Sequence, residues 1–166
     1  MYKFSIKLLV VVCAIGLSSC SSRVCNNWAM EFFSDNPNSI WNRFEPLEGI
    51  FTISDLKKQY DVKVKLSVLN GFEHSRVPIE VVITSPSGQK NIINKILVTK
   101  DNDDNHIGNV HGDVWTIEQI IYSNKEFTEE GEYSFSVQNR TQYYELFKVK
   151  SVAFSVTVAK KKKNEQ

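Results

Sequence analysis

Hydrophobic and polar residues alternate along much of this chain, with a period of two residues. The alternation is clearest over residues 62–68, 79–83, 115–121, 133–137 and 152–158. Successive side chains of a β-strand point to opposite faces of its sheet. Each of these segments therefore predicts a strand with one buried and one more exposed face.

Turn-forming residues indicate how the strands connect. Ser85-Pro86-Ser87-Gly88 leads into an expected hairpin partner over residues 92–99, because proline presets φ and glycine accepts a positive φ. A helical period of 3.6 is visible only as a trace at residues 142–148. About six or seven short strands with turns between them predict an all-β fold, an antiparallel immunoglobulin-like or jelly-roll β-sandwich.

The segment Thr128-Glu129-Glu130-Gly131-Glu132-Tyr133 predicts a particular corner of such a sandwich. It places a glycine two residues before a tyrosine at the start of an alternating strand. In immunoglobulin-like sandwiches, a tyrosine in this setting hydrogen-bonds through its hydroxyl to the backbone across the loop. We interpret the segment as structural.

The amino terminus predicts export. Lys3 and Lys7 precede the apolar run Leu8–Leu17, which as a helix would be about 15 Å long. A bilayer core is about 30 Å thick, so the run indicates a signal peptide and not a transmembrane helix. It ends in Leu17-Ser18-Ser19-Cys20, which resembles the lipobox of bacterial lipoproteins. That resemblance implies a lipid on the Cys20 thiol and cleavage just before it.

A polar stretch follows Cys20, and we interpret it as a tether that becomes ordered near Trp41 or Phe44. Alternatively, Phe32 and Phe33 could join Trp28 on one apolar face of a short helix packed on the domain. The expected regions are a lipoprotein signal peptide, a lipidated tether, a β-sandwich domain and a basic disordered tail, over residues 1–19, 20–43, 44–159 and 160–166 respectively.

Charge and cysteine content narrow the function classes. The chain has 20 basic and 19 acidic side chains, and such a near-neutral balance gives no general reason to bind nucleic acid. Of the three cysteines, Cys13 leaves with the signal peptide and Cys20 takes the lipid. Cys25 is then alone, so no intramolecular disulfide framework is expected. It would be a buried or oxidised thiol, or pair with another chain.

One acidic loop has part of a calcium-binding pattern. Asp101, Asp103 and Asn105 alternate as in a helix-loop-helix calcium site. The position that requires glycine holds His106, and the position of the bidentate glutamate holds Gly112. We therefore expect a solvated loop, with opportunistic calcium binding as the alternative.

Other signs of chemistry are weak. His106, His111 and Asp113 are too loosely spaced to fix a tetrahedral metal site. The chain contains no nucleophile elbow, phosphate loop or dinucleotide motif. We predict that the protein is not an enzyme and has no catalytic residues, no metal site and no cofactor.

Two further features have alternative explanations. Trp115, Tyr122, Tyr143 and Tyr144 could form an aromatic platform for a sugar, although core or sheet-edge positions explain them as well. The lysines at 160–163 could contact anionic head groups, at about 1 kcal/mol per charge near the surface. A solubilising chain end is the other explanation.

The order of several motifs along the chain resembles the gliding-motility lipoproteins of Bacteroidota known as the GldH family. The resemblance rests on Tyr60-Asp61-Val62-Lys63-Val64, Ser85-Pro86-Ser87-Gly88, Gly108…Gly112-Asp113-Val114-Trp115, the segment Phe127–Phe135 and the last strand. The basic end and the Gly108 region depart from the family pattern. The resemblance implies an envelope lipoprotein that supports gliding or the accompanying secretion machinery, with the membrane and an envelope protein complex as partners. It implies no catalytic residues.

The residues after the lipobox bear on location. In related bacteria, lipoproteins displayed outside the cell have acidic residues just after the lipidated cysteine. Here Ser21-Ser22-Arg23-Val24 follows Cys20, and the first acid is Glu31. This favours an outer-membrane anchor that faces the periplasm. The alternative function is a sugar-binding or adhesin-like sandwich on the outer membrane, and a hydrolase comes third.

Overall fold

The computed structural model describes residues 22–26 and 29–160. Its strands, in chain order, are β1 (Ser22–Asn26), β2 (Ala29–Asp35), β3 (Ile40–Asn42), β4 (Leu47–Ile53), β5 (Tyr60–Leu69), β6 (Arg76–Thr84), β7 (Lys90–Val98), β8 (Asn109–His111), β9 (Val114–Lys125), β10 (Gly131–Asn139), β11 (Glu145–Phe147) and β12 (Val149–Val158). All pairings between these strands are antiparallel. Within the described residues, no helix is suited to crossing a membrane. The predicted all-β antiparallel fold is confirmed.

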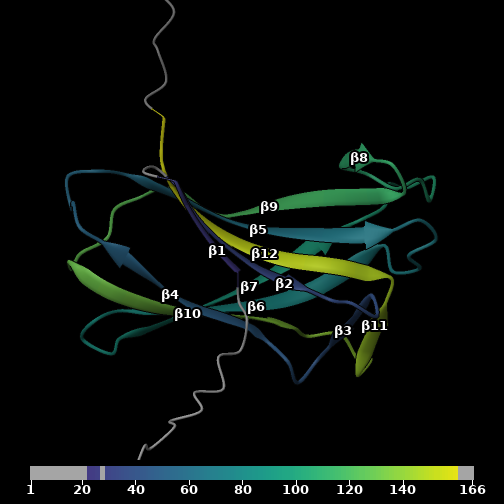
Figure 1. Cartoon of the computed structure of the whole chain (residues 1–166), viewed down its shortest axis with the longest axis horizontal. Helices are drawn as coiled ribbons and strands as arrows, with labels where there is room; N and C mark the ends of the chain where they lie inside the picture. Colours follow the sequence, from purple (N-terminus) through teal and green to yellow (C-terminus); the bar gives the residue numbers. More distant parts are fainter. Residues whose placement is uncertain (1–21, 27–28, 161–166) are drawn as a thin grey trace, which may run out of the picture.

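The strands form two packed sheets and a small ribbon (Figure 1). One sheet has the order β1-β2-β12-β5-β9-β8, and the other has the order β4-β10-β6-β7. β3 and β11 pair separately, at the end of the sandwich on the right of Figure 1. We call this the ribbon end. The opposite end, where β9 leads into β10, is the corner end.

The period-two segments form strands as predicted, and their inward side chains build one core. In β12 the expected exposed face is wrong, because Ala153 and Ser155 are only 4% and 5% exposed. In β5, buried and half-buried positions alternate from Tyr60 to Leu69, and β6 and β10 alternate in the same way. The rings of Phe135 and Phe154 stack across the two sheets with centroids 3.9 Å apart. Phe51 stacks on Tyr133 at 5.4 Å. The aromatic centre therefore joins β4, β10 and β12.

The alternation in β4 is interrupted, and this strand was not among those predicted. Leu47, Phe51 and Ile53 point inward and are buried, but the inward position between Leu47 and Phe51 is Gly49. A Cβ on Gly49 would lie 2.7 Å from Cε1 of Phe135, which is closer than side chains pack. Gly49 thus leaves room for the Phe135 ring. It also interrupts the alternation of hydrophobic and polar residues that would have predicted β4.

The expected tether over residues 20–43 is wrong in its later part. β2 (Ala29–Asp35) lies between β1 and β12 in the six-stranded sheet. Phe32 is only 2% exposed, and its ring lies 4.8 Å from that of Phe135. The domain therefore starts well before residue 44. The alternative of a short helix here is wrong too, and Trp28 lies outside the described residues.

The polar residues that suggested a tether make a turn at the ribbon end. Nδ2 of Asn36 donates to the carbonyl oxygen of Val149 at 3.1 Å, and the backbone N–H of Ser39 donates to the carbonyl of Asn36 at 2.7 Å. Ser39 has a positive φ of 55°. The helical trace at residues 142–148 is also wrong, because Glu145–Phe147 forms β11.

The tyrosine corner is present as predicted. The Tyr133 hydroxyl donates to the carbonyl oxygen of Glu129 at 3.0 Å. Between them, Gly131 has a φ of 126°, in a region that only glycine enters readily. Burial raises the pKa of the Tyr133 hydroxyl. The corner closes the loop between β9 and β10.

The predicted turn at residues 85–88 lies against this corner. The carboxylate of Glu129 accepts hydrogen bonds from the Ser87 hydroxyl at 2.8 Å and from the Ser87 backbone N–H at 3.0 Å. The hydroxyl contributes most to lowering the pKa of Glu129. Gly88, with a φ of 86°, completes the β6–β7 turn. Two loops close in space are thus fixed by one carboxylate.

Candidate functional site

The β3–β11 ribbon is fastened to the core by one residue of each strand. Trp41 and Leu146 lie opposite each other in the pairing register, and they are 3% and 0% exposed. Because neighbouring residues of a strand point to opposite sides, Glu145 and Phe147 point outward and are exposed. The ribbon therefore has a buried inner side and an outer side in solvent.

Buried polar groups fix the loop before β11. Asn139 is fully buried, and its Nδ2 donates to the carbonyl oxygen of Trp41 at 3.4 Å. Its Oδ1 lies 2.9 Å from the Thr141 hydroxyl and also accepts from the Thr141 N–H at 3.3 Å. The Arg43 N–H donates to the Tyr144 carbonyl at 2.7 Å. These bonds hold the 140–144 loop against β3.

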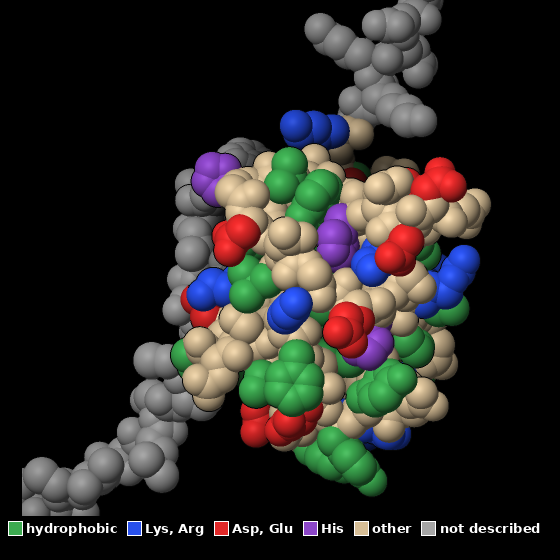
Figure 2. Space-filling model, turned by 90° about the vertical axis from the view of Figure 1, so that its right-hand side faces the viewer, with side chains coloured by type: hydrophobic (Ala, Val, Ile, Leu, Met, Phe, Trp, Pro, Cys, Tyr) green, Lys and Arg blue, Asp and Glu red, His purple; other side chains and the backbone are tan. Residues whose placement is uncertain are grey.

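Four aromatic side chains are exposed on this end, and we call them the aromatic surface. The set comprises Phe44, Tyr143, Tyr144 and Phe147, which are 67%, 48%, 67% and 60% exposed. Phe44 stacks on Tyr144 with ring centroids 5.6 Å apart. Figure 2 looks onto the ribbon end, and hydrophobic side chains gather in its lower half. Exposed apolar side chains gathered at one end are typical of sites that contact a protein or a membrane.

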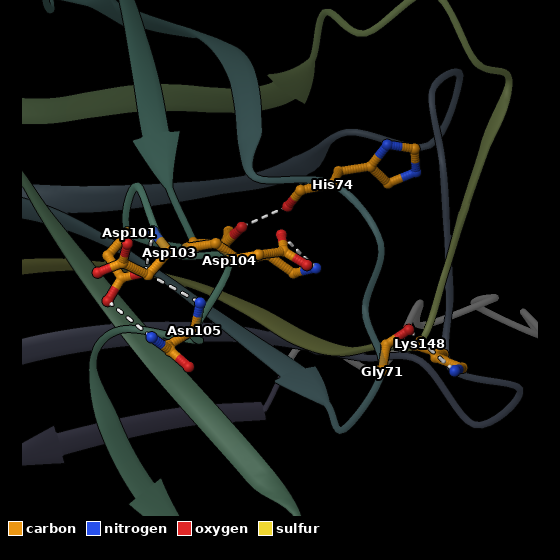
Figure 3. Close-up of polar contacts among 9 residues, drawn as sticks. Gly71, His74, Asp101, Asp103, Asp104, Asn105 and Lys148 are labelled. Atoms are coloured by element: carbon orange, nitrogen blue, oxygen red, sulfur yellow. Dashed lines mark hydrogen bonds and ion pairs between the residues drawn. The ribbon is translucent and has the colours of Figure 1, made fainter.

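A neighbouring loop supports Tyr143. The His74 ring lies 4.9 Å from that of Tyr143. The Thr99 hydroxyl donates to the carbonyl oxygen of His74, and Nζ of Lys148 donates to the Gly71 carbonyl at 2.9 Å (Figure 3). The loop between β5 and β6 is thereby bound to Lys148, which follows β11, and to Thr99, which follows β7.

The acidic loop at residues 101–105 also lies at this end, and its first carboxylate is used by the loop itself. Oδ1 of Asp101 accepts from the backbone N–H groups of Asp103 and Asn105, both at 2.9 Å (Figure 3). The bond from Asn105 contributes most to lowering the pKa of Asp101. Asp101 therefore shapes a turn, in which its carboxylate accepts a bond from the backbone two residues later.

The candidate metal ligands are not gathered into a site. His106 packs beside Trp115, with ring centroids 5.5 Å apart, whereas His111 and Asp113 are exposed on and after β8. Across the described ranges, no three His, Cys, Asp or Glu side chains are grouped so that they could hold a metal ion. Absence of a physiological metal stays a prediction.

The candidate aromatic platform is divided by the structure. Tyr143 and Tyr144 are exposed at the ribbon end, but Trp115 and Tyr122 are partly buried against the core. Tyr122 instead lines a cavity of about 460 Å³ near the corner end, with Asn91 and Lys125 among its neighbours. The four residues therefore do not form one platform.

Sequence reasoning missed Phe44 and Phe147. The only sequence signal that Phe147 is exposed is the polar residue Glu145 two positions earlier, because residues two apart in a strand share a face. Phe44 follows β3 in a turn, where its N–H donates to Oδ1 of Asn42 at 2.9 Å. The predicted lipidation site, Cys20, and the lysines after Lys160 lie outside the described residues.

Comparisons with known proteins bear on these features. The family model described as GldH lipoprotein matches residues 29–156. A search of the curated proteins found no match. Among solved structures, the subviral particle of the infectious bursal disease virus protein VP2 resembles this chain at 12% identity and a TM-score of 0.35. That likeness covers 88% of this chain and 37% of the viral chain.

The family match starts at the first residue of β2 and ends within β12. It thus includes both sheets, the ribbon and the aromatic surface. The family is one of membrane-associated lipoproteins and not a family of enzymes. Since the match spans more than half of the sequence, the chain belongs to the GldH lipoprotein family.

Proposed function

We propose that this protein is a lipid-anchored, non-enzymatic component of the bacterial envelope that supports gliding motility or the protein secretion accompanying it. The observation that supports this most is the family match over residues 29–156, preceded in the same chain by Leu17-Ser18-Ser19-Cys20. Acylation needs the Cys20 thiol, because a thiol is nucleophilic enough to take the lipid near neutral pH. Several acyl chains then give a stable anchor where one would be marginal.

A structural role is supported by the partners of the polar side chains, which hydrogen-bond to the loops and turns of the domain itself. Asn139 and Thr141 fix a loop, Glu129 joins two turns, and Asp101 shapes its own loop. The ribbon end instead exposes the aromatic surface. Such a surface suits contact with another surface.

We place the protein on the outer membrane, facing the periplasm. The support is the sequence after the lipobox, in which Glu31 is the first acidic residue after Cys20. A complex with other envelope proteins would assemble on the described domain.

The anchor is tested by replacing the acceptor. In Cys20→Ala, incorporation of a clickable palmitate should fall to background and the protein should leave the membrane fraction or remain uncleaved. Cys25→Ser is the matched control, because it removes a second thiol only five residues away and should keep full labelling. Equal labelling of wild type and Cys20→Ala would contradict the anchor.

The cellular role is tested in the host. Deletion of the gene should reduce colony spreading or the export of secreted proteins, and wild type should restore it. Cys20→Ala should restore it poorly. A deletion strain that spreads and secretes normally would contradict the role in gliding or secretion while leaving the anchor intact.

A sugar-binding function is the second candidate, and one observation favours it. The cavity beside Tyr122 combines an aromatic ring with amide side chains from Gln89 and Asn91, a combination that suits a sugar ring and its hydroxyls. Titration of the protein with envelope glycans, compared with Tyr122→Ala, tests it. Heat of binding lost in the variant would favour this function, and its absence in wild type would contradict it.

A further inference from the structure

The covalent distance between the proposed anchor and the folded domain is short. β1 begins at Ser22, two positions after Cys20. Two residues span at most about 7 Å, and Ser22 lies opposite Phe33 in the sheet. A bilayer that holds lipid on Cys20 must therefore come up to the sandwich itself.

The strand register gives the direction of this approach. β1 runs from Ser22 to Asn26, and Asn26 lies opposite Ala29, which in turn lies opposite Thr157 near the corner end. Followed backward from Ser22, the strand therefore heads toward the ribbon end (Figure 1). β12 ends at the other side, where Val158 lies opposite Tyr60. A chain that continued along the axis of β1 beyond Ser22 would lead toward the side of the aromatic surface.

The aromatic surface has the composition that a membrane interface favours. Tyrosine and other aromatic rings are enriched at the head-group level, where an apolar ring and a polar tip are both accommodated. Tyr144 and Phe147 are more than half exposed. Next to the residues of the aromatic surface in the chain, Arg43 and Lys148 are matched by Glu45 and Glu145, and the acidic loop adds exposed carboxylates at the same end. Attraction at this end would therefore come mainly from apolar contact.

From the short connection, the strand direction and the exposed rings, we infer that the aromatic surface lies in the head-group region of the membrane that holds the Cys20 lipid. The sandwich then stands on its ribbon end, with the corner end farthest from the bilayer. This inference rests on the lipid anchor proposed above. The acyl chains retain the protein at the membrane, and Phe44, Tyr144 and Phe147 set its orientation.

The test uses the full, lipidated protein in vesicles of phosphatidylethanolamine and phosphatidylglycerol that contain a nitroxide lipid. In a Cys25→Ser background, Tyr144→Cys provides a labelling site in the aromatic surface, and Ile92→Cys provides a matched control. Ile92 is 58% exposed on β7, away from the ribbon end. An environment-sensitive dye reacts only at the new cysteine, because Cys20 is blocked by its lipid. Mass analysis of the amino-terminal peptide verifies that lipid.

The dye at position 144 should shift to the blue and be quenched several-fold more than the dye at position 92. High salt should leave the difference in place, since exposed charges are screened but apolar contact is not. A Phe44→Ser, Phe147→Ser double substitution should reduce the quenching at position 144 while the lipid stays attached.

The other outcomes separate the two proposals. Lipid on Cys20 with equal quenching at both positions overturns the membrane contact and leaves the anchor standing. A missing lipid overturns the anchor and the contact together. A dye at position 144 that is not quenched in vesicles, together with a crosslink from this position to a protein in cells, overturns the membrane contact in favour of a protein partner.

Discussion

The two ends of the sandwich are held in different ways. At the corner end, the Tyr133 hydroxyl bonds to Glu129, four residues earlier. At the ribbon end, Asn36 bonds to Val149 across 113 residues, and Asn139 bonds to Trp41 across 98. The corner tyrosine is thus held by a local bond, although Glu129 also reaches Ser87 across 42 residues. The ribbon itself forms only when distant parts of the chain meet.

The shortness of the ribbon accounts for one member of the aromatic surface. At the corner, Tyr133 is buried and its hydroxyl donates to the carbonyl oxygen of Glu129. This tyrosine therefore stabilises the fold and is not displayed to solvent. At the ribbon end, Trp41 and Leu146 fill the core from two very short strands. Their neighbours must then point outward, and Phe147 is one of them. Burying the inner residues of the ribbon therefore presents the outer ones to solvent.

The largest effect should come from removing the inner contact of the ribbon. Leu146→Ala leaves a cavity beside Trp41 and should lower the free energy of unfolding by about 3 kcal/mol, measured by urea denaturation. Tyr144→Ala, on the exposed side, should change it by about 0.5 kcal/mol or less. Similar losses in both variants would break the distinction between the inner and outer sides of the ribbon.

A smaller effect should come from the corner. Tyr133→Phe removes the hydroxyl bond and leaves the Glu129 carbonyl without that donor, so the free energy of unfolding should fall by about 1 kcal/mol. Tyr143→Phe at the ribbon end is the control. If the denaturant midpoint of Tyr133→Phe equals that of wild type, the hydroxyl bond does not stabilise the corner.

The smallest expected effect is on the pH dependence of stability. Each end has one carboxylate whose lowered pKa contributes to it: Glu129 at the corner end and Asp101 at the ribbon end. The pKa of Glu129 is lowered from its ordinary value of 4.5, chiefly by the Ser87 hydroxyl. A carboxyl whose folded pKa is lowered stabilises the fold above its ordinary pKa, and this stabilisation is lost as the pH falls through the lowered value. Glu129→Gln should therefore have a melting temperature that falls less than that of wild type on acidification.

The same measurement compares the ends. Asp101→Asn should reduce the acid sensitivity at the ribbon end, because backbone hydrogen bonds lower the pKa of Asp101. Glu130→Gln, the exposed neighbour of Glu129, is the control and should follow wild type. If all three variants lose stability in parallel with wild type below about pH 4.5, neither turn depends on its carboxylate.

The sequence predicted those parts of the fold that depend on short-range pattern. The strands around Val64, Val81 and Phe154 alternate regularly, and the corner at Tyr133 follows from a glycine two residues before it. β4 was missed because Gly49 makes room for a ring from another strand. The need for glycine at this position arises from the Phe135 ring, which is far away in the sequence and cannot be seen in the residues around Gly49.

The aromatic surface was predicted only in part for a similar reason. Tyr143 and Tyr144 were candidates, together with Trp115 and Tyr122, because they are aromatic. Their exposures differ because β9 packs in a large sheet, whereas the 140–144 loop rests on the ribbon. The exposure of Phe147 depends on the pairing of β11 with β3, about a hundred residues away.

The position of β1 at the edge of its sheet has a mechanical consequence for a protein held at Cys20. A pull on that residue reaches the domain at Ser22 and acts along the axis of β1. Hydrogen bonds between antiparallel strands run perpendicular to the strands, so the bonds that join β1 to β2 would share the force in shear instead of opening one after another. An anchor that joined the fold in this way would pass tension on Cys20 into the six-stranded sheet.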